Sequence, residues 1–173
     1  ILFLFIFLII CLPSLYSQSK DDKTINDFNF KFTLKLPGEW ETKDMKETID
    51  KDGISYSFEK KDKKMAIMLL AFKLSSVKNI EDFIYNLEKD ISLNIPTKSG
   101  DYDSKDYGTY DMKSANYKDN KFAETIYYYR TKLPDAANNY VYMVRFIMNS
   151  IDANNDTETE IKNIISTFKP TAE

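Results

Sequence analysis

The two arginines of this chain are the side chains best suited to hold an anion. Arg130 and Arg145 lie in consecutive segments that are predicted to pair as strands. Two guanidinium groups that face one patch would suit a carboxylate or a phosphate, because each donates parallel hydrogen bonds from a rigid fork. The alternative is that each arginine pairs separately with a nearby carboxylate such as Glu124, since like charges opposite each other in a ladder are unfavourable without an anion between them.

A second pattern has the spacing of a calcium-binding loop. Five residues occupy positions one, three, five, six and twelve of an EF-hand loop, whose alternate oxygens converge on one ion: Thr48, Asp50, Asp52, Gly53 and Glu59. Position one is threonine instead of aspartate, and the residues after the glycine are typical of a strand instead of a helix. These departures favour an Asp-Gly turn that leads into a strand. The calcium alternative would use Asp50, Asp52 and Glu59 as ligands.

Tyrosines gather in the same region as the arginines. The run Tyr127-Tyr128-Tyr129, together with Tyr140 and Tyr142, could line an aromatic recognition surface, because tyrosine brings contact area at low entropic cost. Alternation along a strand sends Tyr128 to the face opposite Tyr127 and Tyr129. We take Tyr128 and Tyr142 as binding candidates. The alternative is that the tyrosines pack against each other across strands inside the core.

Three aspartates, Asp101, Asp103 and Asp106, offer carboxylates for acid-base catalysis. General acids and bases work near neutral pH when apolar surroundings raise the pKa of the carboxyl group. These aspartates lie in a polar segment without such surroundings, so a solvated loop is the favoured interpretation. A carboxylate-dependent hydrolase would also require two acids that face each other across a pocket.

The first twelve residues, ILFLFIFLIICL, form an uninterrupted apolar run. About 12 residues are too few to cross a ~30 Å hydrocarbon core as a helix, but they match the apolar core of a secretory signal peptide. We predict a signal peptide over residues 1–17, cleaved near Ser17, and a periplasmic or secreted mature protein. Two alternatives stay open: an uncleaved anchor, and a lipoprotein tethered to the membrane through an acylated Cys11.

Cleavage at this point would remove much catalytic chemistry from the mature chain. Cys11 is the only cysteine and histidine is absent, so neither a thiol nor an imidazole would remain. Zinc sites built on Cys and His, disulfides and Ser-His-Asp triads are then excluded. The four glycines are scattered, and no phosphate-binding or dinucleotide fingerprint is present. We therefore expect no cofactor and no enzymatic activity.

The length of the chain indicates a single domain, and its charge indicates a surface on which acidic and basic residues are mixed. Removing 17 of the 173 residues leaves 156, enough for a single domain that buries about 70% of its unfolded surface. The net charge is −3, and acidic and basic residues are interleaved along the chain. A nucleic-acid surface requires a basic face, so nucleic acid is not an expected partner.

Hydrophobic periodicity predicts an antiparallel α+β domain of about six strands over residues 28–170. Residues 18–27 are polar and without periodicity, which indicates a flexible linker, and residues 97–106 are predicted to form a loop. Two helices are predicted, one with Asn79 as its N-cap and one that begins at Asn155 or Asp156. The predicted strands are 28–36, 54–60, 65–74, 107–117, 122–132 and 140–149.

Two of these strands should be central in the sheet. Residues 65–72 (MAIMLLAF) and 140–148 (YVYMVRFIM) are rich in apolar side chains on both faces. An exposed sheet surface does not tolerate such a strand, so each side of the sheet needs a cover. The two amphipathic helices are the natural cover, and we expect an α/β/α sandwich.

The chain contains a strand that ends in a Pro-x-x-Trp sequence, FKFTLKLPGEW at 30–40, then a hairpin, a helix, three strands and a terminal IISTFK at 164–169. This ordered set resembles the PsbP-like superfamily, which includes a photosystem II extrinsic subunit, a nuclear Ran-interacting factor and DcrB-type bacterial envelope lipoproteins. The resemblance implies an antiparallel sheet between helices and a role in binding or assembly without catalysis. It transfers no functional residue, because this chain has no histidine of the kind that binds metal in some photosynthetic members.

The sequence therefore predicts an exported, non-enzymatic module that binds or stabilises an unknown envelope or extracellular partner. This hypothesis requires a contiguous exposed apolar or aromatic patch in place of a deep polar cleft. One alternative is a small-ligand carrier with a cavity between sheet and helix. The other is the carboxylate-dependent hydrolase.

Overall fold

The computed structural model describes residues 21–74, 77, 79–132 and 139–171. The predicted signal peptide, with Cys11, lies outside the described residues. The strands of the large sheet are β3 (Trp40–Glu47), β4 (Gly53–Lys60), β5 (Met65–Leu74), β6 (Lys98–Asp106), β7 (Tyr110–Lys118), β8 (Phe122–Thr131) and β9 (Asn139–Asn149). Those of the small sheet are β1 (Lys23–Asp27), β2 (Phe32–Leu36) and β10 (Lys169–Pro170). The helices are α1 (Ile80–Lys89), the short 3-10 helix η1 (Ile91–Leu93) and α2 (Asn155–Ile165).

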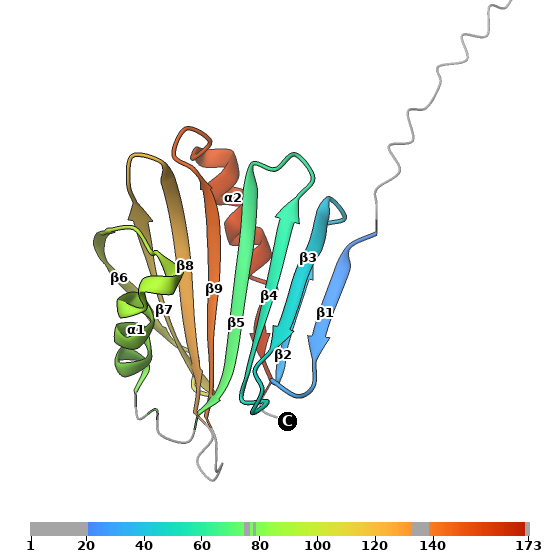
Figure 1. The fold of residues 1–173 in the computed structure, drawn as a ribbon, viewed down its shortest axis with the longest axis vertical. Helices are drawn as coiled ribbons and strands as arrows, with labels where there is room; N and C mark the ends of the chain where they lie inside the picture. Colours follow the sequence, from blue (N-terminus) through green and yellow to red (C-terminus); the bar gives the residue numbers. More distant parts are fainter. Residues whose placement is uncertain (1–20, 75–76, 78, 133–138, 172–173) are drawn as a thin grey trace, which may run out of the picture.

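The large sheet has seven antiparallel strands in the order β3-β4-β5-β9-β8-β7-β6. Strand β9 pairs with β5 over ten residues and thereby joins the two hairpin-linked halves of the sheet. In Figure 1, α1 and η1 lie in front of this sheet, whereas α2 and the small sheet lie behind it. The predicted α+β class, an antiparallel sheet with helices on its faces, is confirmed.

The back core joins the large sheet to α2 and the small sheet. Strand β2 alternates in burial, with Phe32, Leu34 and Leu36 fully buried, because a period of two sends these side chains to one face. The ring of Phe32 lies 5.8 to 5.9 Å from the rings of Tyr142 and Phe168. Aromatic pairs at such distances add stability beyond the area that they bury.

The front core lies beneath α1. Asn79 caps this helix as predicted, since its side chain accepts a hydrogen bond from the backbone N–H of Asp82 at 2.8 Å. The helix buries four side chains at helical spacing: Ile80, Phe83, Ile84 and Leu87. They belong to one buried cluster with Tyr128 and Met143 of the sheet. The position of α1 is thus set by its apolar stripe.

Several element boundaries predicted from the sequence are wrong. Lys23–Asp27 forms β1 and pairs with β2, although a flexible linker was predicted there. Strand β6 replaces the predicted loop, and β3 was not predicted at all. Both β3 and β6 are edge strands with mostly exposed residues, so hydrophobic alternation does not reveal them. The N-cap of α2 is Asn154, one residue before the predicted position, and it forms a capping box with Thr157.

Candidate binding surface

The front of the large sheet is covered along only part of its width. Helix α1 packs on β7 and β8, and it reaches β5 at Phe72, whose ring lies 6.2 Å from that of Phe83. Among the described residues, no helix lies in front of β4 or of the adjoining part of β5 (Figure 1). The expectation that a helix covers both faces of β5 is therefore wrong for this half of the strand. We call the uncovered region the open face. It consists of Ser55, Ser57, Ala66, Met68, Leu70 and Ile147.

The register of the strands brings the residues of the open face together. Ser57 lies opposite Met68, Ser55 opposite Leu70, and Ala66 opposite Ile147. All of them are half-buried. Met68 and Leu70 also pack against the front core, and the small side chains of the two serines leave them partly accessible from the β4 side. Full burial of an exposed Met or Leu side chain contributes about 1.5 to 3 kcal/mol. Because Met68 and Leu70 are only partly buried, a partner that covers them would gain part of this free energy on binding.

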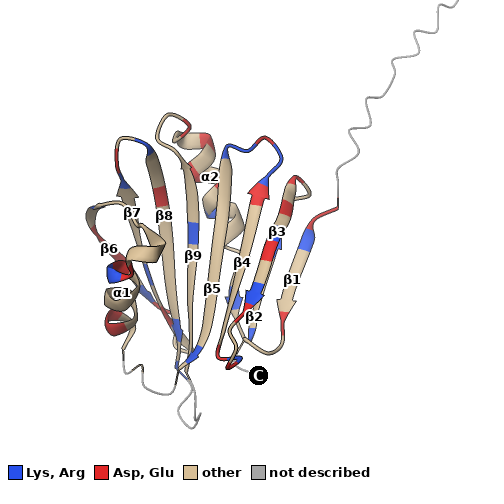
Figure 2. Ribbon diagram, viewed as in Figure 1, with Lys and Arg blue, Asp and Glu red and all other residues tan. Residues whose placement is uncertain are grey.

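Charged residues border the open face on the β3 side. Lys43 lies 3.3 Å from Glu59, and Lys46 lies 2.7 Å from Asp44. Figure 2 shows β3 carrying both red and blue segments, whereas β5 is tan along most of its length. An apolar centre with a charged rim is the usual anatomy of a protein interface.

A buried ion pair forms the other border of the open face. Arg145 donates hydrogen bonds to both carboxylate oxygens of Glu124, at 2.6 and 2.7 Å, and a third to the backbone carbonyl of Leu93 at 2.6 Å. The side chains of Arg145 and Glu124 are 6% and 2% exposed. The guanidinium group therefore holds η1 against the sheet. This places half-buried Leu93 at the rim, and Ile91 of the same turn is 93% exposed.

The structure does not bring the two arginines to a common anion site. Arg145 lies opposite Ile126 in the ladder between β8 and β9, whereas Arg130 lies opposite Val141, four residues further along β8. Arg130 makes a 3.5 Å ion pair with Asp111. Each arginine thus has its own carboxylate, which is the alternative that the sequence left open.

The two candidate tyrosines lie inside the molecule. Tyr128 and Tyr142 are fully buried, one in each core. The hydroxyl of Tyr128 lies 3.1 Å from that of Tyr117, and the hydroxyl of Tyr142 donates to the backbone carbonyl of Phe30 at 2.9 Å. Burial raises the pKa of both Tyr128 and Tyr142 above the usual value. Neither ring offers a surface to a partner.

The residues of the proposed calcium loop form a tight turn. The hydroxyl of Thr48 donates to the Asp52 carboxylate at 2.7 Å and accepts from the backbone N–H of Gly53 at 3.0 Å. Glu59 lies within β4, where it pairs with Lys43. No group of three or more acidic, Cys or His side chains within the described ranges is arranged to hold a metal ion. The observed geometry is therefore the Asp-Gly turn that leads into β4.

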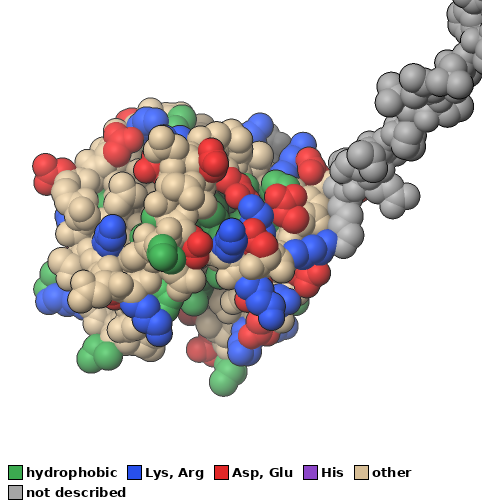
Figure 3. Space-filling view, turned by 90° about the horizontal axis from the view of Figure 1, so that it is seen from above, with side chains coloured by type: hydrophobic (Ala, Val, Ile, Leu, Met, Phe, Trp, Pro, Cys, Tyr) green, Lys and Arg blue, Asp and Glu red, His purple; other side chains and the backbone are tan. Residues whose placement is uncertain are grey.

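Charge on the end of the molecule seen from above is mixed. Basic and acidic side chains are interspersed there with hydrophobic ones (Figure 3).

In the part of the chain that the structure describes, no helix is long and apolar enough to cross a membrane.

Sequence reasoning missed the open face, although its signal is present in the residues. Strand β5 was recognised as apolar on both sides. The serines of β4 alternate with Ile54, Tyr56 and Phe58, which all face the back core or its edge. The sequence signal is a pair of neighbouring strands: one, β4, carries small serines on its front face, and the other, β5, is apolar on both faces. Such a pair indicates an apolar strip that no helix covers.

Comparisons with known proteins identify the fold. The Ran-binding protein Mog1p of Saccharomyces cerevisiae matches 88% of this chain and 96% of its own, with a TM-score of 0.51 and 12% identity. Cyanobacterial PsbP (CyanoP) from Synechocystis sp. PCC 6803 matches 87% of this chain and 93% of its own, with a TM-score of 0.53 and 11% identity. No protein-family model and no curated protein sequence matches this chain. The predicted PsbP-like fold is thereby confirmed, and identities this low establish the fold alone.

Proposed function

We propose that this chain is an exported, non-enzymatic binding module whose open face docks a partner protein of the cell envelope or the extracellular space. The observation that carries the proposal is the half-buried apolar strip on β5, a strand in the interior of a seven-stranded sheet. Interior strands are normally covered on both faces when both faces are apolar. A strip left open in this way marks an interaction site.

The shape of the open face suits one amphipathic helix. Met68 and Leu70 are two residues apart on one strand, hence about 6.6 Å apart, which is close to the 5.4 Å pitch of an α-helix. Strands β4 and β5 together span about 10 Å, which is the width of one helix. Helix α1 packs on the adjoining half of the same face (Figure 1). A partner helix with a single apolar stripe would lie beside it.

Two further points support a binding role. Mog1p, which has the same fold, binds Ran. The acids that a hydrolase would use are solvent-exposed, since Asp101, Asp103 and Asp106 all lie on the exposed edge strand β6. The fold likeness does not name a partner for this chain, so the partner has to be found through the surface of the chain itself.

The experiment compares two charge substitutions of apolar residues. Leu70→Glu places a charge in the open face, whereas Ile151→Glu places one at a 91% exposed site outside it. We expect the unmodified protein and Ile151→Glu to capture the same partner from the envelope fraction, and Leu70→Glu to lose it with its far-UV circular dichroism unchanged. Capture of the same partner by Leu70→Glu would refute the proposal.

Export is tested separately by the intact mass of the protein from its native host. We expect a mature chain that begins at Gln18. A lipid-modified Cys11 would instead make the protein membrane-tethered, and its open face would then act at the membrane surface.

A further inference from the structure

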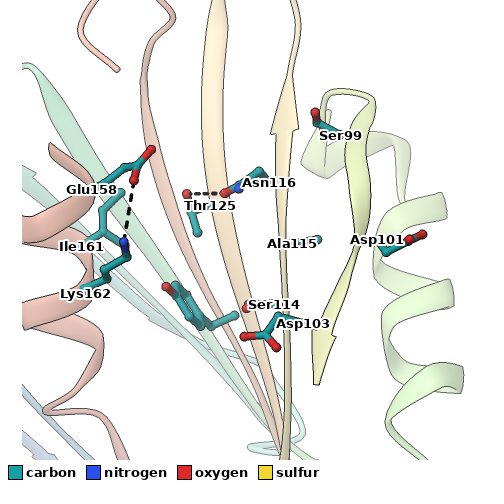
Figure 4. A pocket seen from close by; sticks show the side chains of 11 residues that line it. Ser99, Asp101, Asp103, Ser114, Ala115, Asn116, Thr125, Glu158, Ile161 and Lys162 are labelled. Carbon is teal, nitrogen blue, oxygen red and sulfur yellow. Dashed lines mark hydrogen bonds and ion pairs between the residues drawn. The ribbon is translucent and has the colours of Figure 1, made fainter. Parts of the chain in front are cut away.

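We propose that a groove behind the sheet, between α2 and strands β6 to β8, is a binding site for one sugar ring or a similar polyol. The groove has a volume of about 270 Å³, just below the usual range of small-ligand sites. It lies on the side of the sheet opposite the open face, so it is distinct from the proposed docking surface. Figure 4 shows the side chains that line it.

The groove lies where the back face of β7 and β8 changes from core side chains to mostly polar ones. Near one end of these strands, Met112 and Tyr129 fill the back core, where the ring of Tyr129 lies 4.7 Å from that of Phe168. Further along, the same face carries Ser114 opposite Tyr127 and Asn116 opposite Thr125. The small side chains of Ser114 and Thr125 leave a hollow beside Tyr127 and beneath α2.

Four elements supply the lining. Strands β7 and β8 form the floor with Asn116, Thr125 and Tyr127. Helix α2 contributes Glu158 and Lys162 to one wall (Figure 4). Strand β6 contributes Asp103 on the other side. Because these elements belong to a paired sheet and a helix packed on it, the backbone that carries the polar groups is fixed, and the side chains of Glu158 and Lys162 on it are 65% and 71% exposed.

Hydrogen-bonding capacity in the groove is largely unused. The ring of Tyr127 makes an edge-to-face contact with that of Phe146, with 6.2 Å between the centroids. The Tyr127 hydroxyl has no hydrogen-bond partner among the described residues. Burial, followed by the nearby carboxylates of Asp103 and Glu158, raises the pKa of Tyr127, so the hydroxyl stays a donor. Asp103 makes no ion pair with any described residue.

A hydrogen bond in the floor of the groove fixes the orientation of the Asn116 side-chain amide. Asn116 Oδ1 accepts from the hydroxyl of Thr125 at 2.9 Å, which leaves the Nδ2 group of Asn116 to donate into the groove. The groove therefore presents a carboxylate acceptor, an amide donor and a phenol donor around one small volume.

This set of groups matches a sugar better than other small ligands. Neighbouring hydroxyls of a sugar both donate and accept, so they can satisfy a carboxylate, an amide and a phenol together. The carboxylates of Asp103 and Glu158 disfavour an anion. Lys162, which lies 3.7 Å from Glu158, offsets the charge of one carboxylate. A purely apolar ligand would leave the polar lining unsatisfied.

The test is a titration of the folded protein with glucose, galactose, mannose and N-acetylglucosamine, followed by two-dimensional amide NMR. We expect at least one sugar to shift the amide signals of β7, β8 and the first turns of α2, with a dissociation constant of about 1 mM or lower. Asp103→Ala and Tyr127→Phe should each weaken this binding by about tenfold. Asp50→Ala, which removes an exposed carboxylate far along the chain in the turn before β4, should bind as the unmodified protein does.

Four outcomes would overturn the proposal. Three of them are no shift with any sugar, shifts confined to other parts of the molecule, and unchanged binding by Asp103→Ala. The fourth is tight binding of spermidine in place of the sugars, because the groove would then be a cation site. Leu70→Glu should bind sugar normally, so failure of the docking proposal and failure of this one are distinguishable.

Discussion

Behind the seven-stranded sheet, α2 and the small sheet enclose a core of aromatic rings, whereas in front of it α1 and η1 cover one half and leave the other half open. Phe32, Tyr142 and Phe168 contact each other in the back core and are almost fully buried. In front, Met68 and Leu70 stay half-buried.

The difference shows which face stabilises the fold and which face remains free to bind. The back face encloses the cluster of Phe32, Tyr142 and Phe168, and it joins the first and last described strands, since β2 pairs with both β1 and β10. The front face adds a buried ion pair, which contributes little net stability but costs much when it is broken. The back core can therefore hold the sheet in place while the open face on the other side binds a partner.

The largest expected effect is the loss of a back-core ring. Phe32→Ala should lower the free energy of unfolding by about 4 kcal/mol, because it removes a fully buried ring and leaves a cavity. Leu70→Ala on the open face should cost only about 1 kcal/mol, because its side chain is already partly exposed. Urea denaturation of both variants measures the difference. Equal losses would show that the open face stabilises the fold as much as the back core does.

The next effect tests the buried ion pair of the front face. Arg145→Met should cost about 3 kcal/mol, because it leaves the carboxylate of Glu124 buried without its partner. The double variant with Glu124→Leu should recover most of this loss, since no uncompensated charge remains. Urea denaturation of the single and double variants is the measurement. A double variant as unstable as Arg145→Met would show that packing, and not the unpaired charge, causes the loss.

Alkaline pH should affect both cores through their tyrosines. Burial, followed by a hydrogen bond to Glu88, raises the pKa of Tyr102 to about 12, and burial raises that of Tyr117 and of Tyr142. The unfolded chain ionises first, near pH ~10, so stability contributed by these groups is complete below that pH and is lost as the pH rises above it. Unfolding free energies measured from about pH 8 to about pH 12 should therefore stay level and then fall.

A matched pair of variants locates this effect. Tyr117→Phe should make the alkaline fall less steep, whereas Tyr107→Phe, at a half-exposed site, should leave it unchanged. Tyrosinate absorbance should include a cooperative step, which comes from the buried tyrosines as the cores open. A gradual rise without that step would contradict the burial of these hydroxyls.

The parts of the fold that the sequence predicted are those with a strong apolar pattern, either a continuous apolar run or a stripe at helical spacing. Strand β5 was predicted with its observed bounds, and the stripe of α1 and its cap Asn79 follow directly from spacing. The edge strands β3 and β6 were missed because pairing of their backbones, and not burial of their side chains, holds them in place. The open face and the groove depend on which strands become neighbours, and that order is set by contacts far apart in the chain.

The smallest effect concerns the attachment of α1 to the front of the sheet. Lys113 of β7 lies 2.6 Å from Glu81 in the first turn of α1, and this hydrogen bond lowers the pKa of the Glu81 carboxyl group. A lowered folded pKa means that the stabilisation is present above the usual glutamate pKa and is lost as the pH falls through the folded value. Because Glu81 is 59% exposed, Glu81→Gln should cost no more than about 0.5 kcal/mol near pH ~7 and nothing near pH ~3. Urea denaturation at both pH values measures this, with Glu41→Gln on β3 as the comparison on the opposite border of the open face. An equal cost at both pH values would mean that packing of the side chain, and not its charge, holds the start of α1 in place.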